Sequence, residues 1–280
     1  MTGRQLTAVL LAIVAVALAF VGGLSRYLRD EIVAPRPFAD RALAALDREP
    51  VRAAVVDAVA TQVEQRVPSG LLSAQQARTL AERVVATRAF RRSFRRTALD
   101  ANRVLFQDDA GAATLRLGAL TGAFDTIDPR ISPLLGDAAS QQLLSLRGDD
   151  VGLGTKKLGD GADSLASWCL PLALFALLAA LLLAPRRLAV IRVTAICALL
   201  AGALLLVSLA LGRAAVVDAA KASTGVSVQA ARDAAGAAWE EFTDGLRPWA
   251  LGAVAAGLIV TALTLLPAAL GSGGRRRPAA

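Results

Sequence analysis

Four stretches of the chain are apolar over the length that a membrane-crossing helix requires. They cover residues 6–24, 165–184, 193–211 and 249–270, and the third is entered from Leu188. A transmembrane helix needs about 20 consecutive apolar residues. None of the four stretches contains a charged residue, whereas a core helix of a soluble protein shows polar residues on one face. The pattern therefore predicts four transmembrane helices.

The first stretch also has features of a secretory signal peptide. Ala17-Leu18-Ala19 resembles a signal-peptidase site that follows an apolar run. The apolar run continues to Leu24, which is longer than the core of a usual signal peptide, and only Arg4 precedes it. We expect an uncleaved anchor, with a cleaved signal as the alternative.

The region between the first two stretches alternates helical patterns with breaks. A short amphipathic helix is expected over residues 38–48, and a valine-rich helix begins at Pro50, a residue suited to a first helical turn. Ser73 and Gln76 match a capping box, which predicts the start of one long helix over residues 74–105.

The remainder of that region is less regular. Residues 112–124 are expected to be helical, although the alternation of Leu115 and Leu117 also permits a short strand. A last helix is expected over residues 132–146. The Gly/Asp-rich residues 147–163 are typical of a linker into the second apolar stretch.

Two Ala-rich helical segments, residues 214–222 and 226–242, lie between the third and fourth stretches. We expect their apolar residues to pack on the larger polar region. The fold class is therefore all-α: four transmembrane helices plus a helical domain inserted between spans one and two. The expected domains are an N-terminal anchor (1–24), an extracytoplasmic helical domain (25–164) and a three-span membrane region (165–280) with an outer segment (213–248).

The composition agrees with a helical membrane protein. Hydrophobic residues make up 55% of the 280 residues, above the 45–50% of soluble domains. Alanine and leucine, both strong helix formers, are abundant. The net charge of +8 would raise nucleic acid as a partner of a soluble protein. Its distribution along this chain points instead to a membrane.

Basic residues without acidic neighbours occur at three places: near the N-terminus, between spans two and three, and after span four. These places hold seven basic and no acidic residues, namely Arg4, Arg186, Arg187, Arg192, Arg275, Arg276 and Arg277. Residues 25–164 and 212–248 are close to neutral. Because cytoplasmic loops carry the excess of arginine and lysine, we expect both termini in the cytoplasm and both long segments outside the cell membrane.

Three aromatic residues agree with this orientation. Tyr27 follows span one, Trp168 opens span two and Trp249 opens span four. Tyrosine and tryptophan concentrate at the membrane–water interface. With Arg186 and Arg187 at the opposite ends of their spans, they are the expected membrane-interface anchors.

The residue inventory excludes several chemistries. The chain has no histidine, which removes Ser-His-Asp and Cys-His catalysis and zinc sites built on histidine. The two cysteines, Cys169 and Cys197, lie inside apolar stretches, so the polar region has no disulfide. Asp149, Asp150, Asp160 and Asp163 are split by two lysines and lack the ligand spacing of a calcium loop. We expect no enzyme activity, no metal and no cofactor.

The strongest local signal is a row of arginines on one helix. Arg88, Arg91, Arg92, Arg95 and Arg96 cover an arc of about 140° at 100° per residue, while Phe90 and Phe94 lie opposite. One interpretation is a binding face for an anionic surface. The other is a solvated face whose arginines pair with nearby acids, which is the more common role of such a row.

The layout resembles a group of actinobacterial integral membrane proteins of unknown function. The likeness rests on Phe38-Ala39-Asp40-Arg41 and the valine-rich helix after it, on Ala101-Asn102-Arg103-Val104-Leu105-Phe106, and on the linker into residues 165–187. The resemblance implies one N-terminal span, a large helical extracytoplasmic domain and three C-terminal spans. It implies no catalytic residues.

These observations favour a non-enzymatic membrane protein of the cell envelope. Its outer domain is expected to be a binding or scaffold module for anionic lipid, an envelope polymer or a partner membrane protein, and its first partner is the lipid bilayer itself. The alternative is an accessory subunit of a transporter or channel complex. Nucleic acid is not an expected partner.

Overall fold

The computed structural model describes residues 3–65, 73–106, 112–116, 142–147, 154–185, 187–220 and 227–271. The chain divides into two compact units. We call them the apolar unit (Met1–Tyr27, Ala162–Leu211, Asp244–Ala280) and the polar unit (Leu28–Gly161, Gly212–Thr243). Each unit is built from segments that are distant in the sequence.

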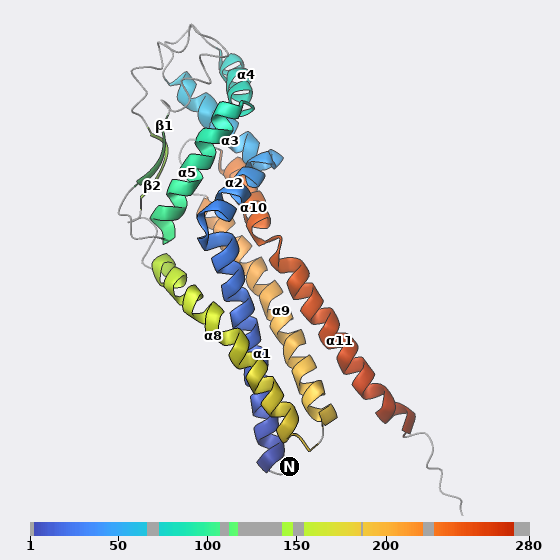
Figure 1. The fold of residues 1–280 in the computed structure, drawn as a ribbon. Coiled ribbons are helices and arrows are strands. Elements are labelled where there is room, and N and C mark those ends of the chain that lie inside the picture. Colours follow the sequence, from blue (N-terminus) through green and yellow to red (C-terminus); the bar gives the residue numbers. More distant parts are fainter. Residues whose placement is uncertain are drawn as a thin grey trace, which may run out of the picture. The chain divides into compact units, whose positions relative to one another are not determined.

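The apolar unit contains α1 (Gly3–Tyr27), α11 (Leu246–Gly271) and most of α8 (Gly154–Leu183) and α9 (Arg187–Ala219) (Figure 1). Residues 154–161 of α8 and 212–219 of α9 belong to the polar unit. Three segments are long and apolar enough to cross a membrane: Gly3–Val33, Arg187–Ala219 and Leu246–Leu265. The expected second span is a shorter apolar helix, Ser167–Leu183. Within the described residues the chain is thus mainly helical with three candidate spans, which is compatible with a multi-pass membrane protein.

Glycines allow the helices of the apolar unit to approach closely. A Cβ on Gly22 of α1 would lie 2.9 Å from the Cβ of Cys169 of α8. A Cβ on Gly202 of α9 would lie 2.8 Å from the carbonyl oxygen of Ala250 of α11. Such distances are shorter than real Cβ contacts, so only glycine fits at these helix crossings. Small residues at the contacts are typical of helices packed in a membrane.

One face of α11 packs against α9 at the crossing of these two helices. The sequence offers two overlapping pairs of small residues four apart, Gly252/Ala256 and Ala253/Gly257. A Cβ on Gly257 would lie 2.6 Å from the carbonyl oxygen of Ala195, whereas one on Gly252 would meet nothing within 4 Å. Ala253 lies against Gly202. The Ala253/Gly257 pair is therefore on the packing face.

A second contact joins three helices near the start of α1. Ala8 and Ala12 of α1 form a buried cluster with Ala180 of α8 and Val190 of α9. The beginning of α1 consequently lies at the same end of the apolar unit as the turn from α8 to α9 (Figure 1).

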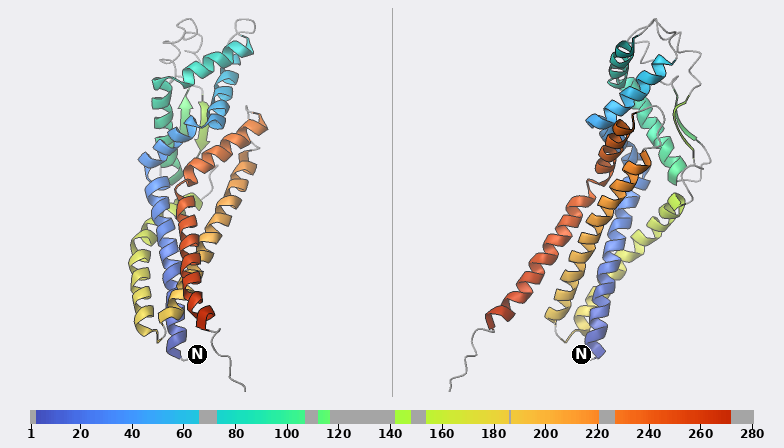
Figure 2. Two further views of the ribbon diagram at one scale, coloured as in Figure 1. Left: turned by 90° about the vertical axis from the view of Figure 1, so that its right-hand side faces the viewer. Right: turned by 180° about the vertical axis from the view of Figure 1, so that it is seen from behind.

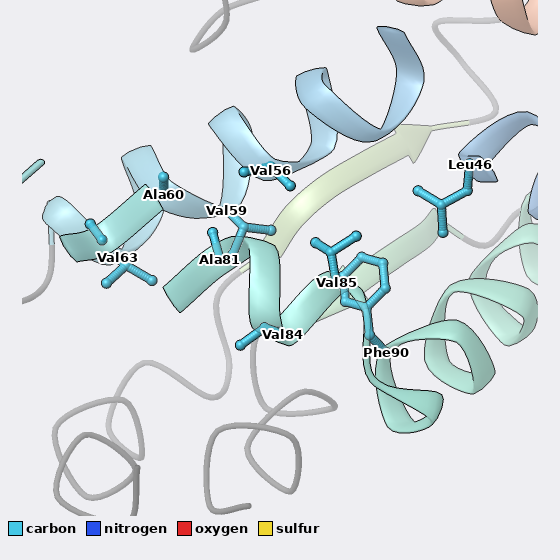
Figure 3. Close-up of a cluster of buried hydrophobic side chains, with 10 residues drawn as sticks. Leu46, Val56, Val59, Ala60, Val63, Ala81, Val84, Val85 and Phe90 are labelled. Carbon is cyan, nitrogen blue, oxygen red and sulfur yellow. The ribbon is translucent and has the colours of Figure 1, made fainter. Parts of the chain in front are cut away.

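The polar unit contains a helical core. Its helices are α2 (Pro35–Asp47), α3 (Glu49–Glu64), α4 (Ala74–Val85), α5 (Arg88–Phe106) and α10 (Val228–Thr243). Figure 3 shows apolar side chains of α3 and α4 facing one another, with Phe90 of α5 beside them. The predicted valine stripe of α3 is confirmed, since Val56, Val59 and Val63 are buried.

One helix was expected over residues 74–105, and this prediction is wrong. The Ser73/Gln76 capping box is present and begins α4, but the helix ends at Val85. The side chain of Thr87 interrupts it: its Oγ1 donates to the carbonyl of Val84 at 2.7 Å and accepts from the backbone N–H of Phe90 at 3.1 Å. A threonine that bonds to the local backbone competes with helix continuation and caps the next helix. The break lets Phe90 turn into the core.

The helices expected over residues 112–124 and 132–146 are replaced, where the structure describes them, by strands. β1 (Ala112–Arg116) pairs antiparallel with β2 (Gln142–Arg147), with Leu115 opposite Leu144. The short strand that the alternation of Leu115 and Leu117 permitted is therefore the correct alternative. Each strand supplies the backbone hydrogen bonds of the other, and the pair lies beside α5 (Figure 2). Residues 117–141 lie outside the described residues.

Two further boundaries differ from expectation. The linker predicted over residues 147–163 is helical from Gly154 onward, because α8 extends well before its apolar part. The segment over residues 214–222 is no separate helix, because α9 continues from the third span to Ala219. Extending an existing helix adds one hydrogen bond per residue, whereas a new helix must be nucleated.

Helix α10 packs on α2 and α3, as the apolar residues between spans three and four predicted. Phe242 contacts Phe38 of α2 with ring centroids 5.2 Å apart. Arg48 donates from Nε and Nη2 to one carboxylate oxygen of Glu241, at 2.9 and 2.7 Å. Arg41 donates to the carbonyl oxygen of Glu241 at 2.8 Å and to the carboxylate of Glu31 at 2.9 Å. This set of contacts holds the two separate chain segments of the polar unit together.

A six-residue π-helix, η1 (Leu28–Val33), follows α1 directly. The carbonyl of Ile32 accepts a hydrogen bond of 2.9 Å from Nδ2 of Asn102. Pro37, five residues further along the chain, has no N–H that could donate to this carbonyl. Asn102 is completely buried on α5. The motif around Asn102, noted in the sequence, thus ties α5 to the beginning of the polar unit.

The crossing of α9 and α11 can be tested by replacing two glycines of α11 with alanine. We expect one replacement to stabilise the protein and the other to destabilise it. Replacing glycine with alanine inside a helix ordinarily stabilises it by about 0.5–1 kcal/mol. We expect Gly252→Ala to show that gain, because its surroundings are open. Gly257→Ala should instead destabilise the protein by about 1–3 kcal/mol, the usual cost of overpacking. Thermal unfolding of the full chain in mild detergent, followed by helical signal, measures both. Equal effects of the two variants would contradict the packing of Gly257 against Ala195.

Candidate functional site

The arginine row lies on α5, and the packing of α5 against the core of the polar unit determines which side of the helix faces outward. Phe90 is completely buried, and Phe94 stacks on it with ring centroids 6.1 Å apart and planes 18° apart. Because the two phenylalanines occupy the inner side of the helix, the opposite side faces outward. All five arginines of the row are exposed. The predicted arrangement of arginines opposite phenylalanines is confirmed.

Two of the five arginines pair with carboxylates of α2. Arg91 makes a two-pronged contact with Asp47, with Nη1 and Nη2 each 2.7 Å from a different carboxylate oxygen. Arg95 donates from Nε and Nη2 to one oxygen of Asp40, at 3.1 and 2.8 Å. Asp40 and Asp47 are seven residues apart, so they lie two turns apart on one face of α2. These two arginines thus have the acidic partners that the solvated-face interpretation expects.

The other three arginines of the row form no ion pair within the described parts of the chain. Arg88, Arg92 and Arg96 follow one another at intervals of four residues, which places them on an arc of about 80°. Nε of Arg92 reaches only the carbonyl oxygen of Arg88, at 3.4 Å. We call these three residues the unpaired arginine face. The acids of α2 neutralise one edge of the row and leave this face with three positive charges.

The Arg91–Asp47 contact is the one with a marked electrostatic signature. The hydrogen bond from Arg91 lowers the pKa of the Asp47 carboxyl, and the charges of Arg91 and Arg52 lower it further. The same hydrogen bond raises the pKa of Arg91. Both groups therefore stay charged over a wider pH range than free side chains. Arg91 is therefore held by Asp47. The charges of the row that remain available for a ligand are those of the unpaired arginine face.

The three aromatic interface residues come together at one level of the apolar unit. Trp249 lies over Gly23 of α1 and against Phe20, with ring centroids 5.2 Å apart. Cys169, next to Trp168, lies against Gly22. Tyr27 lies against Gly245 just before α11. Trp168 and Trp249 are exposed. Aromatic residues at one level of a helical bundle are the arrangement expected of a membrane-interface belt.

Arg187, one of the two expected basic anchors, lies at the other end of the apolar unit. Arg187 opens α9 and is exposed, while Arg186 lies outside the described residues. Arg192, one turn further, donates from Nη2 to the carbonyl oxygen of Thr264 of α11 at 2.8 Å. The sequence predicted the charge of this end but gave no signal for the contact of Arg192 with α11.

Hydroxyl groups inside the candidate spans are mostly satisfied by their own helices. Thr7 donates to the carbonyl of Gly3, Thr261 to Gly257 and Thr264 to Thr261. Thr194 is different: its Oγ1 is buried and has no hydrogen-bond partner among the described residues. The sequence did not distinguish Thr194 from the other hydroxyls.

A hollow of about 380 Å³ lies between α3 and α4 of the polar unit. It is lined by Arg52, Arg78, Glu49 and Glu82 together with small apolar residues. Arg52 pairs with Glu49, and Arg78 pairs with Asp57 and Glu82. Within the described residues, no three acidic or cysteine side chains gather closely enough to hold a metal ion. The hollow therefore offers a charged ligand no unpaired group to bind.

Comparison with protein-family models, curated proteins and solved structures finds no match for this chain. The class of the protein rests on its own geometry. In the part of the chain that the structure describes, three helices are long and apolar enough to cross a membrane, and the polar unit carries an exposed, partly neutralised row of arginines.

The Arg91–Asp47 contact predicts a pH dependence. The lowered pKa of folded Asp47 means that its pairing stabilises the protein above the ordinary aspartate pKa and stops doing so as pH falls through the folded value. At neutral pH we expect Asp47→Asn to lower the free energy of unfolding by at most about 1 kcal/mol, because the pair is exposed. Denaturation of the full chain at a series of pH values measures this.

The difference in free energy of unfolding between wild type and Asp47→Asn should vanish once the pH lies below the pKa of Asp47 in both the folded and the unfolded state. Arg91→Gln removes the other partner of the pair. The double variant Asp47→Asn/Arg91→Gln should have nearly the same free energy of unfolding as Asp47→Asn alone. A difference that persists in acid would mean that the pair does not cause the loss.

Proposed function

We propose that this chain is a non-enzymatic integral membrane protein of the cell envelope, whose polar unit is a binding or scaffold module outside the cytoplasmic membrane. In this proposal the chain crosses the membrane four times, with Ser167–Leu183 as the second crossing. That segment falls short of the usual length of about 20 residues. It is, however, the end of the 30-residue helix α8, which is long enough to continue beyond the apolar layer.

The proposed orientation places the arginine-rich end of the apolar unit in the cytoplasm. The support comes from two opposite ends of one helical bundle: exposed Arg187 at one, and Tyr27, Trp168 and Trp249 at the other. Positive residues favour the cytoplasmic side, and aromatic residues favour either interface. Both termini of the sequence then lie in the cytoplasm, and the two segments of the polar unit lie outside.

The observation that carries the binding proposal is the division of the arginine row. If all five arginines were paired with acids, the row would be a solvated face. Three of them, Arg88, Arg92 and Arg96, have no acidic partner within the described residues. An exposed arginine near an anionic membrane surface contributes about 1 kcal/mol to binding within a Debye length of about 10 Å.

The covalent connection to the bundle adds to this effect. A polar unit joined to membrane helices stays near the lipid surface without affinity for it, so a weak basic face acts at high effective concentration. We propose that the unpaired arginine face binds anionic lipid headgroups and thereby orients the polar unit. In the test below, a soluble polyanion represents the alternative ligand, an envelope polymer.

Cysteine labelling tests the orientation. In a Cys169→Ala/Cys197→Ala background, single substitutions Gln75→Cys, Gln229→Cys and Ser272→Cys report the two segments of the polar unit and the C-terminal tail. Gln75 and Gln229 are exposed. An impermeant thiol reagent should label the first two in intact cells and the third only after lysis. Labelling of Ser272→Cys before lysis would overturn the orientation.

Vesicle flotation tests the unpaired arginine face. The full chain is placed in nanodiscs of neutral lipid and mixed with vesicles that contain phosphatidylglycerol or only phosphatidylcholine. Wild type should bind the phosphatidylglycerol vesicles, more weakly as salt rises. Arg88→Gln/Arg92→Gln/Arg96→Gln should lower binding by up to about 100-fold, since three arginines contribute about 1 kcal/mol each.

A matched control removes the paired edge of the row without changing net charge. The variant Asp40→Asn/Asp47→Asn/Arg91→Gln/Arg95→Gln eliminates both ion pairs and leaves the unpaired arginine face intact. It should bind as wild type does. The lipid proposal fails if this control and the triple variant bind alike, or if wild type binds a soluble polyanion but neither kind of vesicle.

A further inference from the structure

An apolar groove in the apolar unit stands apart from the arginine row on α5. It has a volume of about 330 Å³ and lies where α8, α9 and α11 meet. Leu177 and Leu181 of α8 line one side, and Gly257 and Val260 of α11 line the other. Thr194 and Ala198 of α9 also line it. Alanines line the groove at three positions, Ala195, Ala198 and Ala256, where larger side chains would fill the space.

The groove occupies a limited depth of the bundle. Along α9 it runs from Val190 to Ala198, eight residues apart. At 1.5 Å per residue this is about 12 Å. The apolar core of a bilayer is about 30 Å thick, so the groove lies within one leaflet. It fits one fatty acyl chain entering from one surface better than a partner helix, which would cross both leaflets.

A positive charge lies above the groove on the same face of α9. Arg187 precedes Val190 and Ile191 by three and four residues, the spacing of neighbours on one helix face. Helical side chains lean toward the N-terminus, and long basic side chains reach toward the membrane surface. The exposed Arg187 is thus suited to meet a phosphate group at the headgroup level while the acyl chain lies below it.

Two buried polar atoms near this end have no hydrogen-bond partner among the described residues: Oγ1 of Thr194, which lines the groove, and Nε of Arg192. Nη2 of Arg192 is already bonded to the carbonyl oxygen of Thr264. Both atoms are hydrogen-bond donors, and buried donors of this kind are rarely left without a partner. The ester oxygens of a phospholipid are acceptors located between its phosphate and its acyl chains.

We propose that this groove is a binding site for one acyl chain of an anionic phospholipid, with Arg187 on its phosphate. The site is separate from the unpaired arginine face, and neither proposal depends on the other. It would retain a lipid of the leaflet at the arginine-rich end of the apolar unit. The lipid would then cover the crossing of α9 and α11.

Native mass spectrometry of the full chain in mild detergent tests the site by titration with phosphatidylglycerol and with phosphatidylcholine. Wild type should retain phosphatidylglycerol preferentially. Arg187→Gln should reduce that preference by about fivefold, the effect expected for one arginine at a membrane surface. Arg4→Gln removes one exposed charge from the same end and is the matched control, which should leave the preference unchanged.

Filling the groove tests the position of the acyl chain. Ala198→Phe should abolish retention of both lipids, whereas Ala210→Phe, at an exposed position of the same helix, should not. If Ala198→Phe fails to fold, the smaller Ala198→Leu must give the same loss. The proposal is overturned if Arg187→Gln and Arg4→Gln change the lipid preference equally, or if filling the groove leaves lipid retention intact. It is also overturned if wild type is a dimer and filling the groove converts it to a monomer, because the groove would then hold a second copy of the chain.

Discussion

The apolar unit depends on how closely two helix backbones can approach. Helices within a lipid environment gain little from burying apolar side chains, since lipid tails are as apolar as leucine, so they associate through close packing. Here that packing occurs at Gly22, Gly202 and Gly257, where neighbouring atoms leave no room for a Cβ. Large leucines and isoleucines are displaced to the outside, where many are exposed. Beside the crossing of α9 and α11, the short side chains of Ala195, Ala198 and Ala256 line the groove.

The polar unit is stabilised by different interactions. Its core consists of valines and alanines together with Leu46 and Phe90, and its helices are joined by ion pairs across their surfaces. Exposed pairs contribute little stability each, but they decide which charges stay available. Asp40 and Asp47 on one face of α2 take up Arg91 and Arg95, and Arg88, Arg92 and Arg96 lie beyond their reach. The division of the arginine row is therefore a consequence of how α2 packs against α5.

The sequence predicted those features that depend on neighbouring residues. Long apolar runs identified the helices of the apolar unit, and the contacts of Ser73 with Gln76 and of Phe90 with Phe94 are local. The break at Thr87 was missed because neither glycine nor proline occurs in residues 74–105, so the sequence favours one helix there. Strand β1 was only an alternative and β2 was missed, because each depends on a partner about thirty residues away. The carboxylate partners of Arg91 and Arg95 could not be assigned for the same reason, although the spacing of Asp40 and Asp47 was visible.

The two-segment construction of the polar unit has a consequence for its synthesis. Arg48 and its partner Glu241 are 193 residues apart in the sequence. At about 5–20 residues per second, the ribosome completes α10 roughly 10–40 s after α2. During that interval Phe38 and Arg48 lack the partners that α10 provides. The nascent polar unit therefore passes through a prolonged incomplete stage in which a chaperone, or a neighbouring unfinished chain, has access to the surface that α10 later covers.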